Sequence, residues 1–341
     1  MKSATHCQLL LPGMMHELAA ATSCPPALGS MLRVARREAV FAGSDHAWRC
    51  RFFGVARQQD DPVAPFSCLG DGLDPGMDYW LCVNPVTLHL HRDSFVLADG
   101  LACGLTMGQA RVLTGMLNDH FAAEGMRFFA PHANRWYLRL PQPLRLETHP
   151  LLEVTGQSVV HVLPQGEDAR MWNARLNEIQ MMLHEHPVNL ELEQQGGLPV
   201  NSLWAWGGGK LAPGAAKPEL TVWAHDPFSL GLAQAHGSRS AALPDSAMDW
   251  QAGGLAPGEH LVVLDRLGQA DLRDDARDWH EALQRMERHW FAPLLAALRD
   301  GSITSLALHL GATRNVSSYT LTRTALHKFW RRRRMLGDYL G

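Results

Sequence analysis

Short, almost wholly apolar runs at both ends of the chain constrain its fold more than any other feature. Residues 7–11 (CQLLL) and 261–264 (LVVL) have the length and composition of strands buried on both faces, and residues 303–310 form a third strand. Segments with a helical spacing of apolar residues, such as residues 26–37 and 275–298, separate these strands. Strands that alternate with helices predict an α/β fold with a doubly wound, mostly parallel sheet.

The middle of the chain has a different pattern. From residue 80 onward, strand-like runs follow one another, as at residues 80–83 and 86–91. We therefore expect an inserted α+β subdomain at residues 80–165 and a core formed by residues 1–79 and 166–341. The first and last strands of the chain should then share one sheet.

The composition gives the chain as a whole no electrostatic attraction to nucleic acid or membranes. Its 341 residues carry a formal net charge of −3, and its longest apolar runs are far too short to span a bilayer. None of the six cysteines belongs to a C-x-x-C pair, so we expect buried thiols and no structural zinc site. The first 16 residues lack the long apolar stretch of a signal peptide. We expect a cytoplasmic protein without a membrane partner.

Residues 176–210 are the most distinctive stretch. A helix runs into the motif HPVN at residues 186–189, a glycine turn follows, and the strand at residues 200–206 opens into three glycines. Glycine-rich turns after a strand let backbone N–H groups approach an anion. A hinge and a tight turn without a ligand is the alternative interpretation.

These motifs resemble those of archaeal-type cofactor-independent phosphoglycerate mutases, members of the alkaline-phosphatase superfamily. That family carries His-Pro-x-Asn after a helix, then Gly-x-x-x-Ala-Asn and Trp-Gly-x-Gly. The resemblance covers most of the chain at low identity and implies an alkaline-phosphatase-like fold. In length and in the phrase HEHPVN…VNSLWxWGGG, the chain is even more similar to the RpfE-type group of bacterial proteins, which are named as regulators. Further matching segments are residues 43–45 (GSD), 81–84 (LCVN), 134–137 (NRWY) and 262–269 (VVLDRLGQ).

Most of the ligands that the resemblance implies for two divalent metals are missing. Where an active member ends its first strand in Asp-Gly, this chain has Pro12 and Gly13, and the family's His after Gly268 is Gln269. Asp265 is retained, but the late Asp-His pair is replaced by GATR at residues 311–314. One carboxylate cannot hold two divalent cations. We therefore expect no metal and no other cofactor, and a divalent metal belongs only to the alternative of an active enzyme.

Cys50 stands where the family has its nucleophilic serine. A thiolate nucleophile needs a depressed pKa and therefore nearby positive charge, and Arg49 and Arg51 are its neighbours in the sequence. Neighbours in a strand point to opposite faces, however, which favours Cys50 as a small core-lining residue. If any catalysis remains, Cys50 and Asp265 are the candidate catalytic residues.

Residues at the ends of helices and strands are candidates for binding a small phosphorylated ligand, because such loops vary while the scaffold positions them. We predict a cleft between the lobes, beyond the carboxyl end of the strand at residues 200–206. An arginine at this place could clamp an anion through two N–H groups, whereas buried asparagines at a hinge could equally serve only the loop backbone. The candidate lining residues are His186, Asn189, Asn201, Trp206, Gly207, Gly208, Gly209 and Arg135.

A basic cluster near the C-terminus, residues 328–334, fits an acidic or nucleic-acid partner, and its aromatics could stack on bases. A solvated helical tail is the alternative. For the whole chain, two functions stay open. One is a non-catalytic binding or regulatory protein that keeps a phosphate-type pocket. The other is an active phosphoglycerate mutase or phosphatase with altered metal ligands or a Cys nucleophile.

Overall fold

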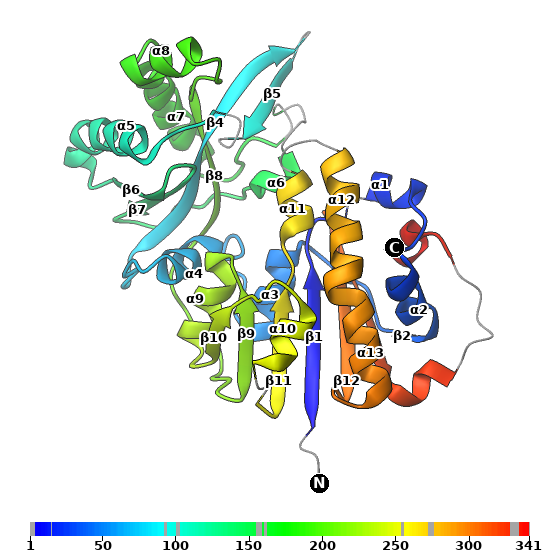
Figure 1. Cartoon of the computed structure of the whole chain (residues 1–341). Helices are drawn as coiled ribbons and strands as arrows, with labels where there is room; N and C mark the ends of the chain where they lie inside the picture. Colours follow the sequence, from blue (N-terminus) through cyan, green and yellow to red (C-terminus); the bar gives the residue numbers. More distant parts are fainter. Residues whose placement is uncertain are drawn as a thin grey trace. The chain divides into compact units, whose positions relative to one another are not determined.

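The chain divides into two compact units (Figure 1). The first comprises Met1–Gly54 and Gly214–Gly341, and the second comprises Val55–Pro213. Among the described helices, none combines the length and the apolarity needed to cross a membrane. The computed structural model describes residues 4–14, 16–91, 94–99, 103–154, 159, 162–253, 256–271, 276–327 and 334–340.

The first unit alternates strands with helices, as its apolar runs predict. Its elements are β1 (Thr5–Leu11), α1 (His16–Ala21), α2 (Pro26–Val34), β2 (Arg36–Arg37), β3 (Phe41–Ala42), α3 (Asp45–Phe53), β9 (Leu220–Ala224), α9 (Pro227–Ala235), β10 (Arg239–Ala242), α10 (Ala247–Ala252), β11 (Gly258–Val263), α11 (Arg266–Asp271), α12 (Ala276–Met286), a π-helical turn (Glu287–Phe291), α13 (Ala292–Asp300), β12 (Ser305–Gly311), β13 (Asn315–Thr322) and two 3₁₀ turns (Arg323–His327 and Leu336–Tyr339).

An eight-stranded sheet organises this unit. Its order is β10-β9-β11-β1-β12-β13-β2, and β3 also pairs with β13. The five strands from β10 to β12 are parallel, whereas β13 is antiparallel to its neighbours. Leu9 of the central strand β1 is in register with Val262 on one side and Leu308 on the other (Figure 1). The first and last parts of the chain therefore share one sheet, and the predicted α/β fold class with a parallel-rich sheet is confirmed.

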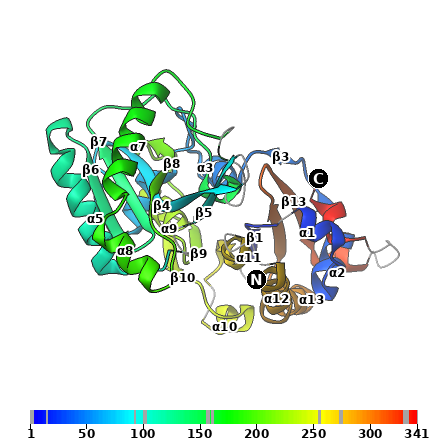
Figure 2. The same cartoon turned by 90° about the horizontal axis from the view of Figure 1, so that it is seen from above.

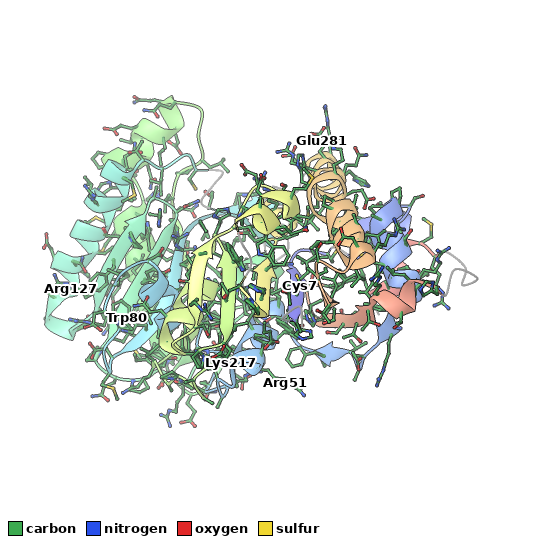
Figure 3. All side chains as sticks on the ribbon, turned by 60° about the horizontal axis from the view of Figure 1, so that its bottom comes forward. Cys7, Arg51, Trp80, Arg127, Lys217 and Glu281 are labelled. Atoms are coloured by element: carbon green, nitrogen blue, oxygen red, sulfur yellow. The ribbon has the colours of Figure 1, made fainter. Side chains whose placement is uncertain are left out.

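Helices cover both faces of this sheet, because successive side chains of a strand point to opposite sides. Leu9 and Leu11 belong to the apolar core that includes residues of α2, α12 and α13. On the other face, the ring of His309 lies 4.3 Å from that of Trp48 on α3. Figure 2 shows α3 and the α12–α13 pair on opposite sides of the sheet. In Figure 3, Cys7 lies in the interior and Glu281 of α12 points outward.

The second unit is an α+β arrangement around a five-stranded antiparallel sheet. Its strand order is β5-β4-β7-β6, and β8 pairs with β4. Helices α5 and α7 supply much of its apolar core, and α5 begins with a capping box between Thr106 and Gln109. Its elements are α4 (Val63–Gly70), β4 (Tyr79–His91), β5 (Ser94–Asp99), α5 (Met107–His120), a 3₁₀ turn (Ala122–Glu124), β6 (Arg127–His132), β7 (Arg135–Leu140), α6 (Leu151–Val154), α7 (Ala169–Leu183), α8 (Pro187–Gln194) and β8 (Ser202–Gly209).

The second unit differs in its bounds from the expected insertion at residues 80–165. Helices α7 and α8 and strand β8 belong to it, although the sequence places them in the core. The reason is pairing, because β8 forms an antiparallel ladder with β4, in which Ser202 faces Val86 and Trp206 faces Cys82. A central strand is a buried apolar run in a parallel and in an antiparallel sheet alike. The sequence pattern therefore does not show with which strands it pairs.

Candidate functional site

A hollow of about 320 Å³ opens in the first unit at the carboxyl ends of three parallel strands, β9, β10 and β11. His225 follows β9 directly, Leu264 follows β11 directly, and Asp245 lies in the loop after β10. Ligands of open α/β sheets bind beyond this edge of the sheet. The hollow is therefore the candidate functional site. Its lining is completed by Leu243, Pro244, Arg266, Arg285, Met286, His289 and Trp290.

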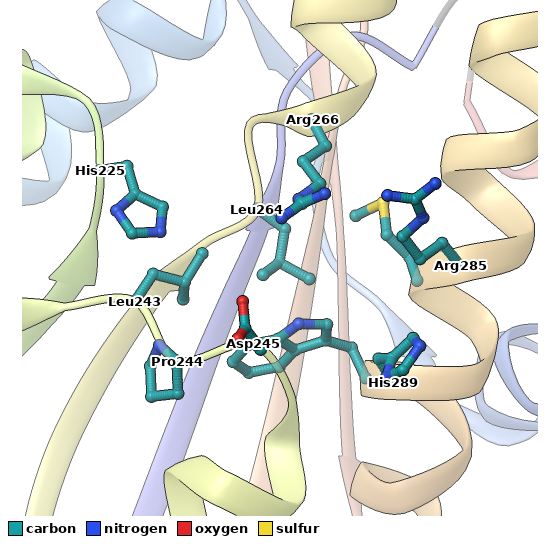
Figure 4. Close-up of a pocket in the computed structure, with 10 residues that line it drawn as sticks. His225, Leu243, Pro244, Asp245, Leu264, Arg266, Arg285 and His289 are labelled. Carbon is teal, nitrogen blue, oxygen red and sulfur yellow. The ribbon is translucent and has the colours of Figure 1, made fainter.

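Positive groups dominate the polar lining. Arg266 is the first residue of α11, and Arg285 lies in the last turn of α12. Figure 4 shows both guanidinium groups directed into the hollow from these helices, with His225 across from Arg285. All three side chains are exposed, and neither arginine forms an ion pair with the described carboxylates. Two fixed positive charges against the single carboxylate of Asp245 favour an anionic ligand.

The floor of the hollow is apolar and rests on the π-helical turn. Leu264, Met286 and Trp290 are at most 5% exposed. The turn Glu287–Phe291 is held by its own Glu287, whose carboxylate accepts hydrogen bonds from the backbone N–H groups of Ala27 (2.6 Å) and Leu28 (3.2 Å) at the start of α2. Single π-helical turns of this kind occur frequently at functional sites. The turn places His289 on the rim and Trp290 beneath it.

A buried ionic cluster lies at the same edge of the sheet. Arg49 of α3 is 4% exposed and lies between the carboxylates of Asp45 and Asp226. Its Nη1 donates to Asp226 Oδ1 at 2.8 Å and to Ser229 Oγ at 2.9 Å, and its Nη2 donates to Asp45 Oδ2. Burial raises the pKa of Asp45, but the charges of His46 and Arg49 outweigh it, so that the pKa is lowered overall.

The residues at this edge do not fit the pair of divalent metals that the resemblance implies. Pro12 and Gly311, which follow and end the adjacent strands β1 and β12, have no side-chain ligand atom. Asp265 lies in the turn after β11, and the carboxylate of Asp45 is bound by Arg49. Within the described ranges, no group of three or more His, Cys, Asp or Glu side chains could hold a metal ion.

Cys50 lies on α3, so the prediction that it lies in a strand is wrong. Ser44 caps this helix by accepting a hydrogen bond from Ala47 N at 3.2 Å, and Gly54 ends it in the left-handed conformation. These two residues are ordinary helix start and stop signals. Cys50 is 2% exposed and is not among the lining residues of the hollow.

The predicted lining residues all belong to the second unit, and the side chains of three of them, His186, Asn189 and Asn201, bind the chain's own backbone. Asn189 binds the carbonyls of Leu183 and Val200 and accepts from Val200 N, each at 2.8 Å. Asn201 makes two comparable bonds to the backbone of Leu88. His186 accepts from Val188 N at 3.2 Å, because the HPVN motif starts α8 at Pro187.

Two other predicted lining residues are engaged by side chains. Arg135 forms a two-pronged ion pair with Asp71, and Trp206 Nε1 donates to Asn84 Oδ1 at 2.8 Å. Of the predicted set, Asn201 lines a second hollow of about 720 Å³ between α7 and β8, together with Gln180 and Trp204. The described geometry thus favours backbone and packing roles for most of the set.

The triple glycine packs against helix α4 and strand β4. It lies within β8 of the antiparallel sheet, so the prediction of a turn at the carboxyl end of a parallel strand is wrong. A Cβ at Gly209 would lie 2.5 Å from Pro62 Cβ, and one at Gly207 would lie 2.9 Å from Val63 Cβ. Glycine is required here because helix and strand approach so closely.

The arginines and histidines of the hollow are not among the site residues predicted from the sequence. His225 and Arg266 each stand just after a buried strand, and this position was their available signal. Arg285 and His289 lie further along the chain, on a helical segment whose apolar spacing marks its buried face but does not show which exposed side chains reach the hollow. Of the predicted basic cluster, residues 328–333 lie outside the described residues.

Comparison with known proteins gives partial matches to one kind of enzyme, and no family model matches. Over 116 residues the chain is 28% identical to the 2,3-bisphosphoglycerate-independent phosphoglycerate mutase of Methanosarcina mazei, covering 33% of this chain and 29% of that protein. Over 150 residues it is 27% identical to a probable mutase of the same name from Geobacter sulfurreducens, covering 43% and 37%. A third, from Methanothermobacter thermautotrophicus, is 26% identical over 227 residues, covering 60% and 55%. The matches thus span from about a third to about half of these relatives.

Two solved structures cover the whole chain. The PH0037 protein from Pyrococcus horikoshii matches with a TM-score of 0.58 at 13% identity, covering 93% of that protein, and it shares the fold. A cofactor-independent phosphoglycerate mutase from Thermoplasma acidophilum matches with a TM-score of 0.46 at 18% identity, covering 95% of that protein. The chain thus has a mixed α/β fold with a parallel-rich sheet, and it shares this fold with the PH0037 protein. Its homologues at low identity are cofactor-independent phosphoglycerate mutases.

Proposed function

We propose that this chain is a phosphoglycerate-mutase-like protein that binds a small phosphorylated ligand in the hollow at the carboxyl ends of β9 to β11, without transferring the phosphoryl group. The observation that carries the proposal is the pair of guanidinium groups of Arg266 and Arg285, which lie on two helices above an apolar floor and form no ion pair with the described carboxylates. A cytoplasmic regulatory role, like that named for the RpfE-type proteins, fits a binding protein of this kind.

The chemistry of the lining supports a phosphate rather than a carboxylate alone. A guanidinium group presents paired N–H donors that match two oxygens of a phosphate, and two such groups match a doubly charged anion. The imidazoles of His225 and His289 add further donors at the rim. The volume of about 320 Å³ suits a three-carbon phosphate or a mononucleotide. The curated relatives act, by name, on phosphoglycerate, which belongs to this class.

The same lining lacks the hydroxyl or thiol nucleophile and the paired metal ligands that the resemblance implies for phosphoryl transfer. It contains no Ser, Thr or Cys, and its one carboxylate, Asp245, cannot hold two metals. Cys50, the candidate nucleophile of the alternative, is buried on α3. The alternative of an active mutase or phosphatase therefore has less support than binding alone.

Isothermal titration calorimetry with inorganic phosphate, 3-phosphoglycerate and AMP tests the proposal. We expect Arg266→Ala and Arg285→Ala each to weaken binding by about tenfold to a hundredfold, since one charge-assisted hydrogen-bonding group contributes about 1.5–3 kcal/mol. Arg288→Ala, an exposed arginine in the neighbouring turn that does not line the hollow, is the matched control. Binding that neither lining change weakens would exclude this pocket. Mutase or phosphatase turnover by the wild-type chain would exclude the non-catalytic role.

A further inference from the structure

Arg49 is the most enclosed ionic group at the carboxyl edge of the first unit's sheet. It projects from α3, whose first residue is Asp45, toward Asp226, the residue that caps α9. Asp226 Oδ1 accepts from Ser229 N at 2.9 Å as well as from Arg49 Nη1 at 2.8 Å. The ring of Phe228 lies 4.8 Å beneath the guanidinium carbon. Contacts from two helices thus fix the group on several sides.

The charges of this cluster require a cation. Asp45 and Asp226 have side chains that are 12% and 20% exposed, so that water solvates neither carboxylate well. Oδ2 of Asp226 is buried and has no hydrogen-bond partner among the described residues. Two carboxylates that converge in such surroundings attract a counter-ion strongly. In this chain the nearest positive charge is the guanidinium group itself.

The location of the cluster is that of the metal ligands that this chain lacks. A Cβ added at Gly311, the last residue of β12, would lie 3.2 Å from Asp45 Cβ and 3.5 Å from Pro12 Cα. Asp45 therefore lies beside the ends of β1 and β12, where the resemblance implies carboxylate and imidazole ligands. Asp226 follows β9 at the same edge.

We infer that the guanidinium group of Arg49 is a built-in cation that occupies a two-carboxylate site and thereby replaces a divalent metal ion. The side chain supplies one positive charge and directed N–H donors, where a metal would supply two charges and accept oxygen ligands from the same carboxylates. The two carboxylates at the carboxyl ends of the strands are thereby neutralised without a metal ion. This inference does not depend on ligand binding at the neighbouring hollow.

Removing the guanidinium group distinguishes this role from that of an ordinary ion pair between helices. Arg49→Ala leaves two carboxylates and the Ser229 hydroxyl facing a cavity. We expect this variant to unfold at a lower temperature than the wild type, and Mn²⁺ at 1 mM to raise its Tm by several degrees with about one ion bound per chain. Wild type should show neither the Tm increase nor the bound ion. The double variant Arg49→Ala/Asp226→Asn should lose the response, and Arg51→Ala, an exposed neighbour on α3, should behave as wild type.

A metal response of Arg49→Ala that is absent, or that persists in the double variant, would overturn the inference. Mn²⁺ binding to wild type that Asp45→Asn abolishes would also overturn it. If Arg49→Ala is unfolded without metal, circular dichroism provides the readout. Recovery of ellipticity on adding Mn²⁺ supports the inference, and failure to recover contradicts it. Phosphate titrations of the wild type decide the proposed function separately.

Discussion

Arg135 and Asp71 form a two-pronged ion pair, with Nε 2.7 Å from Oδ2 and Nη2 2.6 Å from Oδ1. Tyr137 donates a third hydrogen bond to Oδ2 at 2.7 Å. The Asp71 side chain is 6% exposed, so this pair ties the loop after α4 to strand β7 in a largely dry environment. The guanidinium group is therefore committed to the second unit's own structure.

The first prediction follows from this pair. Arg135→Ala should lower the free energy of unfolding by about 2–4 kcal/mol, because it leaves a buried carboxylate without its counter-charge. Urea denaturation monitored by tryptophan fluorescence measures the loss. Arg139→Ala, whose guanidinium is 3.7 Å from the half-exposed Asp78, should cost under about 1 kcal/mol. Equal losses in the two variants would contradict the assignment.

The second prediction concerns pH. Burial raises the pKa of Asp60 to about 6, although Thr148 donates hydrogen bonds to both carboxylate oxygens. The native state therefore holds this proton more tightly than the unfolded state, so its stabilising contribution is present below pH 4 and is lost as pH rises through 6. Relative to Asp60→Asn, wild type should gain about 2–3 kcal/mol between pH 7 and pH 4. Denaturant titrations across this range check the difference, and a constant difference would refute it.

The third prediction tests the packing of the triple glycine. Gly207→Ala should destabilise the protein by about 2–4 kcal/mol, because the added methyl group meets Val63 and the residue has φ of +65°. Gly196→Ala is the matched control, since its φ is +79° and nothing lies within 4 Å of the added Cβ. It should cost only about 1 kcal/mol, from backbone strain alone. Thermal and urea unfolding measure both, and similar costs would show that close packing is not the reason for Gly207.

The fourth prediction concerns metal content. The purified protein should contain no stoichiometric pair of divalent ions, because Pro12 and Gly311, at the carboxyl ends of β1 and β12, have no side-chain ligand atoms. Inductively coupled plasma mass spectrometry after dialysis against Mn²⁺ and Zn²⁺ measures this. Two ions per chain, lost together in Asp265→Asn, would contradict the prediction and favour an active enzyme.

Local sequence patterns predicted the secondary structure better than they predicted the candidate functional site. The capping residues Thr106 and Gln109 mark the start of α5 in the sequence, and the helix begins there. Ser44 and Gly54 mark the start and the end of α3 in the same way, although the prediction placed Cys50 in a strand. At residues 186–189 a proline ends one helix and starts another, because Pro187 fits the first turn of α8.

By itself, the sequence determined that its apolar runs become strands of one parallel-rich sheet, because a run such as residues 7–11 can hide its side chains only between two layers. Only the tertiary structure decided that β8 joins β4, since antiparallel pairing depends on a partner more than 100 residues away. The tertiary structure also decided which residues form the candidate functional site. Arg266 and Arg285 come from separate helices and meet His225 only where the carboxyl ends of the strands bring them together. Glycine motifs are visible along the chain, whereas convergence on a sheet edge is a property of the folded molecule.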